Sequence, residues 1–209
     1  MSYFPIVLEM TGRRCLVIGG GVVAERKIAG LLEVGAAVTV ISPEVTAAIL
    51  NWAKNHSIQL TARCYQNGDL SGHVLVFVAT DDPDVNDQVY HEGQSCGVWV
   101  NAADDPAHCD FILPAVIRRG ELTVAISTGG ASPAATRAIR EALDDYFTAE
   151  YAQLVQVAAE VRMELKEKSV NVDADAWNSA LKGEFRRLIR AGRPDQAKEC
   201  LLTMLGARS

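Results

Sequence analysis

Three consecutive glycines, Gly19 to Gly21, stand between an apolar stretch and a helical pattern, an arrangement that can bind phosphate. The spacing Gly19-x-Gly21-x-x-Ala24 fits the dinucleotide-binding fingerprint, with alanine in the third small position. In that fingerprint Gly19 allows a sharp turn, Gly21 lets a pyrophosphate approach the backbone, and Ala24 lets the helix pack closely on the strand. The unpaired N–H groups at the helix start would then face the phosphates. A glycine-rich turn before an ordinary helix is the alternative when the motif is considered alone.

The next expected strand, 38–41, is followed by Ser42-Pro43-Glu44. In the dinucleotide-binding fingerprint, an acidic residue that binds the ribose normally stands at the end of this strand, about 20 residues after the glycines. Ser42 stands at that place here. Ser42 could hydrogen-bond a ribose hydroxyl, whereas Glu44 is more simply an acid in the first turn of a helix. Pro43 suits the first position of that helix. No basic residue stands here to receive a 2′-phosphate, so the sequence favours NAD over NADP by default.

Strands alternate with helices up to about residue 105, which predicts an α/β fold with a Rossmann-type, doubly wound parallel sheet. The expected strands are 13–18, 38–41, 58–62, 74–79 and 98–100. Ligands of such sheets bind beyond the carboxyl ends of the strands. Two loops at those ends are rich in aspartate, 80–82 and 101–105, and we expect the chemistry there. The predicted cofactor contacts are Gly19, Gly20, Gly21, Val22, Val23, Ser42, Pro43, Glu44, Thr80, Asp81 and Asn101.

The pattern changes after Pro106. Two strand-like runs, 111–118 and 122–127, are joined closely enough for a hairpin. A two-stranded ribbon is barely stable alone, so we interpret it as a dimerisation element. A second glycine and hydroxyl turn, Ser127 to Pro133, runs into a helix ending near residue 147, and the remainder is helical, with helices near 151–168, 176–191 and 194–205. The predicted division is a dinucleotide-binding domain at 1–110, a dimerisation segment at 111–147 and an all-helical domain at 148–209.

Composition excludes several classes of protein. A net charge of −6 argues against a general nucleic-acid binder, and no apolar run approaches the ~18 residues that span a bilayer. The N-terminus has no basic region before its short apolar piece, so no signal peptide is expected. Five cysteines without a C-x-x-C pair favour reduced thiols and a cytoplasmic protein. His108-Cys109-Asp110 cannot readily converge on one ion, because neighbours on an extended segment face opposite ways, so no metal site is predicted.

An ordered set of segments resembles one family. These segments are Phe4-Pro5-Ile6, Gly19 to Lys27, Ala79 to Asp82, Asn101 with Asp104, Phe111 to Ala115, and Ser127 to Pro133. They look like the precorrin-2 dehydrogenases, which occur alone or as the first module of siroheme synthases. The set spans residues 3 to about 145 and is more specific than the glycine fingerprint alone. The methyltransferase half of the fused siroheme synthases is not expected in this chain.

The resemblance implies a reaction, a cofactor and a partner. Precorrin-2, an octacarboxylate, would be oxidised by NAD to sirohydrochlorin in a homodimer, and some relatives then insert ferrous iron. Asp104 matches the family's essential aspartate; a residue of an ordinary turn is its alternative role. The expected substrate-binding residues are Ser127, Thr128, Gly129, Gly130, Arg118 and Arg137. Arginine suits the substrate because its guanidinium pairs with carboxylates in a bidentate manner.

Two other functions stay open at this point. A bifunctional enzyme would also insert Fe²⁺ or Co²⁺ into sirohydrochlorin, holding the metal transiently through Asp104 or a histidine. A nucleotide-sensing regulatory module would perform no chemistry. Such modules usually keep the acidic ribose ligand that Ser42 replaces, and they lack the turn at 127–133. The pathway's end product, siroheme, haem d1 or cobalamin, does not follow from the sequence.

Overall fold

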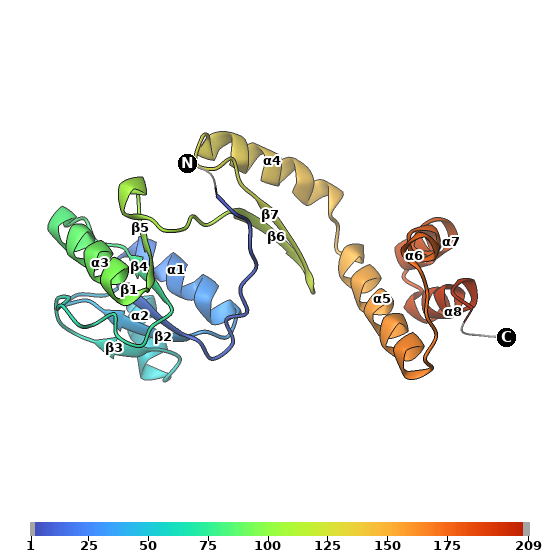
Figure 1. Cartoon of the computed structure of the whole chain (residues 1–209), viewed down its shortest axis with the longest axis horizontal. Coiled ribbons are helices and arrows are strands. Elements are labelled where there is room, and N and C mark those ends of the chain that lie inside the picture. The colour runs from blue at the N-terminus through green and yellow to red at the C-terminus, as the bar shows by residue number, and fades with distance from the viewer. Residues whose placement is uncertain (1–2, 207–209) are drawn as a thin grey trace. The chain divides into compact units, whose positions relative to one another are not determined.

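A computed structural model describes residues 3–206 of the chain. Residues 1–2, which belong to the N-terminal segment considered above, and residues 207–209 lie outside the described range. The chain divides into two compact units, Met1–Ile112 and Leu113–Ser209. Each unit has its own secondary structure and its own apolar core, and each is described by itself (Figure 1).

The first unit contains a parallel sheet of five strands in the order β3-β2-β1-β4-β5. The strands are β1 (Arg14–Ile18), β2 (Ala37–Ile41), β3 (Gln59–Thr61), β4 (Leu75–Val78) and β5 (Trp99–Ala102). The helices are α1 (Val22–Glu33), α2 (Ala47–Lys54) and α3 (Pro83–Cys96), and a short 3₁₀ turn, η1, covers Pro106–His108. The doubly wound α/β architecture predicted from the alternation of strands and helices is confirmed.

Side chains of β1 alternate between two cores, which explains why helices cover both faces of the sheet (Figure 1). Cys15 belongs to one core, together with Ile28 of α1 and Ile49 of α2. Leu16 belongs to the other core, together with Val89 of α3. All five of these side chains are fully buried. Burial raises the pKa of the Cys15 thiol to about 11, so this cysteine acts as an apolar core residue.

Two helix starts show how local chemistry decides where an element begins. Asp82 caps α3 by accepting hydrogen bonds from the backbone N–H groups of Asp84 and Val85. The start of α2 was predicted wrongly at Pro43. The helix begins at Ala47 because Thr46 is its cap, accepting a hydrogen bond from the backbone N–H of Ile49.

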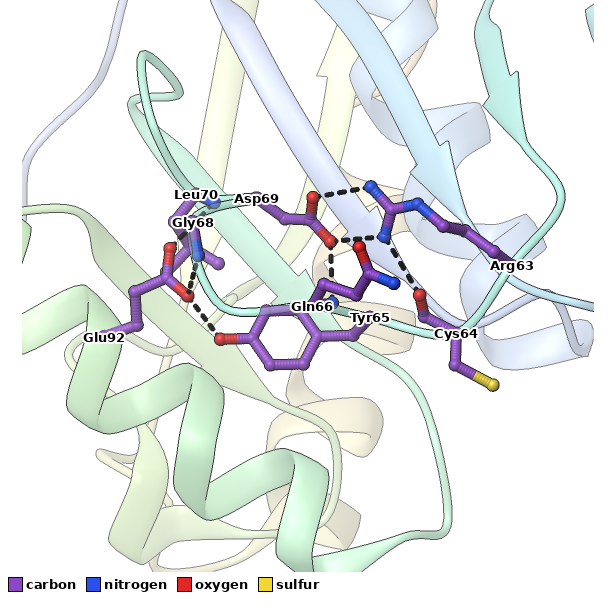
Figure 2. A network of polar contacts seen from close by, with 8 residues as sticks. All are labelled: Arg63, Cys64, Tyr65, Gln66, Gly68, Asp69, Leu70 and Glu92. Carbon is purple, nitrogen blue, oxygen red and sulfur yellow. Dashed lines mark hydrogen bonds and ion pairs between the residues drawn. The ribbon is translucent and has the colours of Figure 1, made fainter.

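A long connection between β3 and β4 is fastened to α3 by polar contacts (Figure 2). The Glu92 carboxylate accepts hydrogen bonds from the Tyr65 hydroxyl and from the backbone N–H groups of Gly68 and Leu70. Arg63 donates two hydrogen bonds of 2.7 Å to Asp69, and this pairing lowers the pKa of the Asp69 carboxyl group. The connection therefore has a defined path although it contains no helix or strand.

The second unit begins with an antiparallel hairpin of β6 (Ala115–Arg119) and β7 (Leu122–Ile126), followed by α4 (Pro133–Tyr146). The hairpin agrees with the sequence prediction, and Ser132 caps α4 by accepting a hydrogen bond from the backbone N–H of Ala135. The first strand is shorter than expected, since residues 111–114 lie outside it. Pro114 has no N–H to donate, and the Phe111 ring meets the edge of Phe77 at 5.5 Å within the first unit.

Four further helices complete the second unit: α5 (Glu150–Glu167), α6 (Ala174–Ala180), α7 (Gly183–Arg190) and α8 (Pro194–Met204). The sequence predicted one helix over 176–191, and this was wrong, because α6 and α7 are separate. Gly183 begins α7 with a φ of +54°, which an ordinary α-helix cannot contain. Phe185, fully buried, lies in the core that α5, α7 and α8 share.

Replacing Phe185 with alanine is expected to destabilise the second unit by about 3–5 kcal/mol, because it removes a fully buried ring and leaves a cavity. Thermal unfolding should then begin roughly 12 °C lower or more. Met163→Ala is the control, since 65% of that side chain's surface is exposed and the change should be small. Equal shifts for both variants would contradict this assignment of the core.

Candidate active site at the carboxyl ends of β1, β4 and β5

The glycine turn after β1 has almost no room at two positions and open space at the third. A Cβ on Gly19, whose φ is +115°, would lie 2.2 Å from the Ala79 carbonyl oxygen. A Cβ on Gly20 would lie 2.0 Å from the Glu44 carbonyl oxygen, whereas one on Gly21 would meet nothing within 4 Å. Gly21 precedes α1 without a side-chain cap, so the first N–H groups of α1 face open space. This cradle fits a pyrophosphate, and cofactor contacts of Gly19 to Val23 stay predictions.

The turn after β2 supports the glycine turn from behind. Ser42 is only 6% exposed, and its hydroxyl donates a 2.6 Å hydrogen bond to the Glu44 carbonyl oxygen. The Thr46 backbone N–H donates to the Gly20 carbonyl oxygen at 2.9 Å, and its hydroxyl donates to the Glu25 carboxylate at 2.7 Å. The Ser42 hydroxyl is thus engaged in shaping this turn, and ribose contacts of Ser42, Pro43 and Glu44 stay predictions. The link from Thr46 to Glu25 was not anticipated from the sequence.

A cavity of about 340 Å³ lies where β4 and β5 end and α1 begins. It brings together the start of α1 and both aspartate-rich loops, as the sheet topology predicts. Its lining residues are Val23, Ala79, Thr80, Asp81, Pro83, Asn86, Ala103, Asp104 and Asp105. Asp104 has a φ of +59°, a conformation that side-chain-bearing residues adopt uncommonly and that occurs often at functional sites.

Asn101 lies on β5, and its side chain is engaged within the protein. It is 7% exposed, and its amide group donates to the Phe111 carbonyl oxygen at 2.9 Å and to the Cys109 sulfur at 3.5 Å. Its carbonyl oxygen accepts a 3.4 Å hydrogen bond from the Lys27 ammonium group. These contacts make Asn101 a brace between α1, β5 and the chain leaving the first unit, and a direct cofactor contact stays a prediction.

Lys27 is the charged residue at this site that sequence reasoning did not assign. Burial lowers the pKa of its ammonium group, while the charges of Cys109 and Asp104 act in the opposite direction. The ammonium group also lies 5.6 Å from the centre of the Phe77 ring. Its only signal in the sequence was its place in the helix that follows the glycine turn.

The segment that carries Asp104 is tied to α3 through His108. The Nδ1 atom of His108 lies 2.6 Å from Asp105, and its Nε2 atom lies 3.5 Å from Asp87. The edge of the Tyr90 ring meets the imidazole at 5.2 Å. The hydrogen bond with Asp105 raises the pKa of His108, and the same bond lowers the pKa of Asp105.

The stabilisation from this pair should depend on pH. It is fully present below the ordinary histidine pKa of 6.5 and is lost as the pH rises through the raised pKa of folded His108. On the acid side, it is lost as the pH falls through the lowered pKa of Asp105. The difference in Tm between the wild type and His108→Gln should therefore narrow as the pH rises from about 6.5 into the alkaline range. A difference that stays constant over this range would contradict the ion pair.

The predicted substrate-binding residues lie at three places in the second unit: on β6, in the turn Ser127–Gly130 and on α4. The turn Ser127–Gly130 is held by its own hydroxyls, because Thr128 Oγ1 accepts from the Ser132 N–H at 3.1 Å and Ser127 Oγ accepts from the Gly129 N–H at 3.1 Å. The Arg137 guanidinium is 81% exposed and lies 3.4 Å from Glu141. Substrate contacts of Ser127, Thr128, Gly129, Gly130, Arg118 and Arg137 stay predictions.

The sheet, the glycine turn and the uncapped start of α1 define a dinucleotide-binding protein. Residues 6–115 match a family model described as "Putative NAD(P)-binding", and residues 119–146 match one described as "Sirohaem biosynthesis protein central". The first match covers more than half of the chain, which therefore belongs to this putative NAD(P)-binding family.

Known proteins resemble the chain over nearly its whole length. The siroheme synthase of Nitrosococcus oceani is 39% identical over 203 residues, which are 96% of this chain and 43% of that protein. The siroheme synthase of Methylococcus capsulatus is 37% identical over 204 residues, or 97% of this chain and 43% of that protein. The chain thus spans less than half the length of these relatives. A solved structure of SirC, a precorrin-2 dehydrogenase, is similar with a TM-score of 0.73 and 29% identity, covering 99% of this chain and 100% of that one.

Among residues 3–206, no helix is both long and apolar enough to cross a membrane.

Proposed function

We propose that this chain is an NAD-dependent precorrin-2 dehydrogenase, which oxidises precorrin-2 to sirohydrochlorin. The observation that carries the proposal is the position of Asp104 in a cavity that also contains the start of α1. A carboxylate and a dinucleotide cradle at one edge of a parallel sheet are what a hydride-removing enzyme needs. The likeness to SirC, a precorrin-2 dehydrogenase, over the whole of both chains supports the choice of substrate.

The reaction needs a hydride acceptor and a proton acceptor. Precorrin-2 and NAD⁺ give sirohydrochlorin, NADH and a proton, so the macrocycle loses two electrons as a hydride and loses one further proton. NAD, when bound, supplies the carbon that receives the hydride. The role we assign to Asp104 is to accept the proton and pass it to water, since its carboxylate lines the cavity. The 3.4 Å hydrogen bond between Lys27 and Asn101 links α1 to β5.

The substrate's eight carboxylates need cationic partners, and we assign these to Arg118 on β6 and Arg137 on α4. A homodimer is also part of the proposal. Its support is α4, which has no buried residue although it carries apolar side chains such as Ile139, 44% exposed, and Tyr146, 64% exposed. A second copy would cover these side chains. Thiols that are free of disulfides agree with the cytoplasm as the proposed compartment.

Purified protein mixed with precorrin-2 and NAD tests the proposal. We expect NADH and sirohydrochlorin to form in equal amounts, each followed by its own absorbance, and NADP to be used less well. A parallel reaction without the protein gives the rate of spontaneous oxidation. Formation of sirohydrochlorin without NADH, or at the protein-free rate, would overturn the proposal.

A further inference from the structure

Asn86, in the first turn of α3, has a buried oxygen atom without a partner. The residue is 8% exposed, and its Oδ1 atom has no hydrogen-bond partner within residues 3–206. Buried polar side-chain atoms almost always have partners, so such an atom points to a missing ligand or water. Asn86 also lines the cavity that contains Asp104 and Thr80. The unpartnered acceptor therefore belongs to a residue in the wall of the candidate active site.

The neighbours of Asn86 decide which end of its amide remains unpartnered. The pKa of Asp105 is lowered chiefly by His108 and, to a smaller degree, by the Asn86 side chain, and an ionised aspartate can only accept a hydrogen bond. The NH₂ group of Asn86 must therefore face Asp105, and the carbonyl oxygen must face away from it. Asp105 is itself held by His108 at 2.6 Å, and His108 lies 3.5 Å from Asp87 on α3. This chain of contacts fixes the orientation of the amide before any ligand binds.

An acceptor at this place requires an N–H donor from the ligand. The cavity also contains Val23, two residues after Gly21, so it is continuous with the start of α1, where the cofactor's phosphates are proposed to bind. At the redox end of NAD, the carboxamide of the nicotinamide ring supplies an NH₂ group. The second torsion angle of asparagine is soft, so a small tilt of the amide can bring its oxygen to the cavity surface.

We propose that the Asn86 carbonyl oxygen accepts a hydrogen bond from the nicotinamide carboxamide and thereby sets which face of the ring turns toward Asp104. This inference rests on the proposed function for the identity of the cofactor. Asn86 is then a cofactor-binding residue, and Asp105 and His108 are positioning residues that act through it.

Equilibrium binding tests this without any turnover. The probes are NAD and 3-acetylpyridine adenine dinucleotide, in which a methyl group replaces the carboxamide NH₂ and the carbonyl group is kept. Titration calorimetry should show that the wild type binds NAD about tenfold more tightly or better, because the analogue leaves the acceptor unpaired. Asn86→Leu should bind NAD about as weakly as the analogue and should not discriminate between them. Asn51→Leu, at an exposed position on α2, should keep the wild-type ratio.

Each outcome has one meaning. Equal affinity of the wild type for the two dinucleotides would overturn the inference, and this comparison needs no variant to fold. Full discrimination in folded Asn86→Leu would overturn it as well. Tight, discriminating NAD binding together with no NADH from precorrin-2 would refute the proposed reaction and leave the assignment of Asn86 standing.

Discussion

Asp104→Asn is expected to lower kcat for precorrin-2 oxidation by about 10²- to 10⁴-fold, the range that a general base usually contributes. Asparagine has nearly the same shape as aspartate, and it tolerates the left-handed backbone that Asp104 adopts with a φ of +59°. The loop should therefore keep its conformation while losing its proton acceptor. NAD affinity should change by less than about threefold, because the dinucleotide cradle lies on α1 and is untouched.

Two controls separate this chemical effect from a structural one. Asp195→Asn removes an exposed carboxylate in the first turn of α8 and should leave kcat unchanged. The thermal unfolding of Asp104→Asn should match that of the wild type within about 2 °C. If Asp104→Asn kept full turnover, the proton acceptor would have to be another group. A wild type that binds NAD but shows no turnover would instead support the nucleotide-sensing hypothesis.

The sheet and its active edge could be predicted because their signals are local. Val76 and Phe77 lie in an unbroken apolar run, and such runs indicate strands buried on both faces. The glycine spacing placed the turn after β1, and the rule that ligands bind at the carboxyl ends of parallel strands then placed Thr80 and Asp104 on one cavity. None of these steps required knowledge of a contact between distant side chains.

The residues that sequence reasoning missed all act through contacts across the fold. Lys27 donates a hydrogen bond to Asn101, which lies 74 positions later in the chain, and the sequence around either residue does not indicate this contact. Ser42 and Asn101 were predicted to contact a cofactor because of their place at strand ends. The structure shows that their side chains are engaged inside the protein, by Glu44 and by Phe111. Position at an edge can be predicted from sequence, whereas the direction of a side chain depends on its neighbours.

The start of α2 and the break between α6 and α7 illustrate the same limit. Pro43 is a good first residue for a helix, yet the turn that follows β2 is occupied by contacts with Gly20, so the helix begins only after Thr46. The apolar spacing over 176–191 continues through the break at Gly183 because both short helices pack on one core. The spacing of apolar residues indicates which residues are buried, and two short helices that pack on the same core can keep the spacing of one long helix.

Gly20→Ala is expected to lose mainly stability and Gly21→Ala mainly NAD affinity, although the two positions are adjacent. A methyl group on Gly20 would lie 2.0 Å from the Glu44 carbonyl oxygen and 2.8 Å from the Ser42 hydroxyl. Relief requires the backbone after β2 to move, so we expect a loss of about 3 kcal/mol or more in the free energy of unfolding. A methyl group on Gly21 meets nothing within 4 Å, and the free energy of unfolding should fall by less than about 1 kcal/mol.

Gly21→Ala, the variant with the smaller loss of stability, should show a large loss of dinucleotide affinity. In Gly21→Ala the methyl group occupies the open space in front of α1 that a pyrophosphate needs, and NAD affinity should fall about 100-fold or more in a protein that remains folded. Chemical denaturation and calorimetry on the same samples measure both quantities. NAD bound equally well by folded Gly21→Ala would show that the phosphates do not rest on this turn. Because that result would leave the fold intact, it would move the cofactor to another part of the sheet edge without disturbing the description of the sheet.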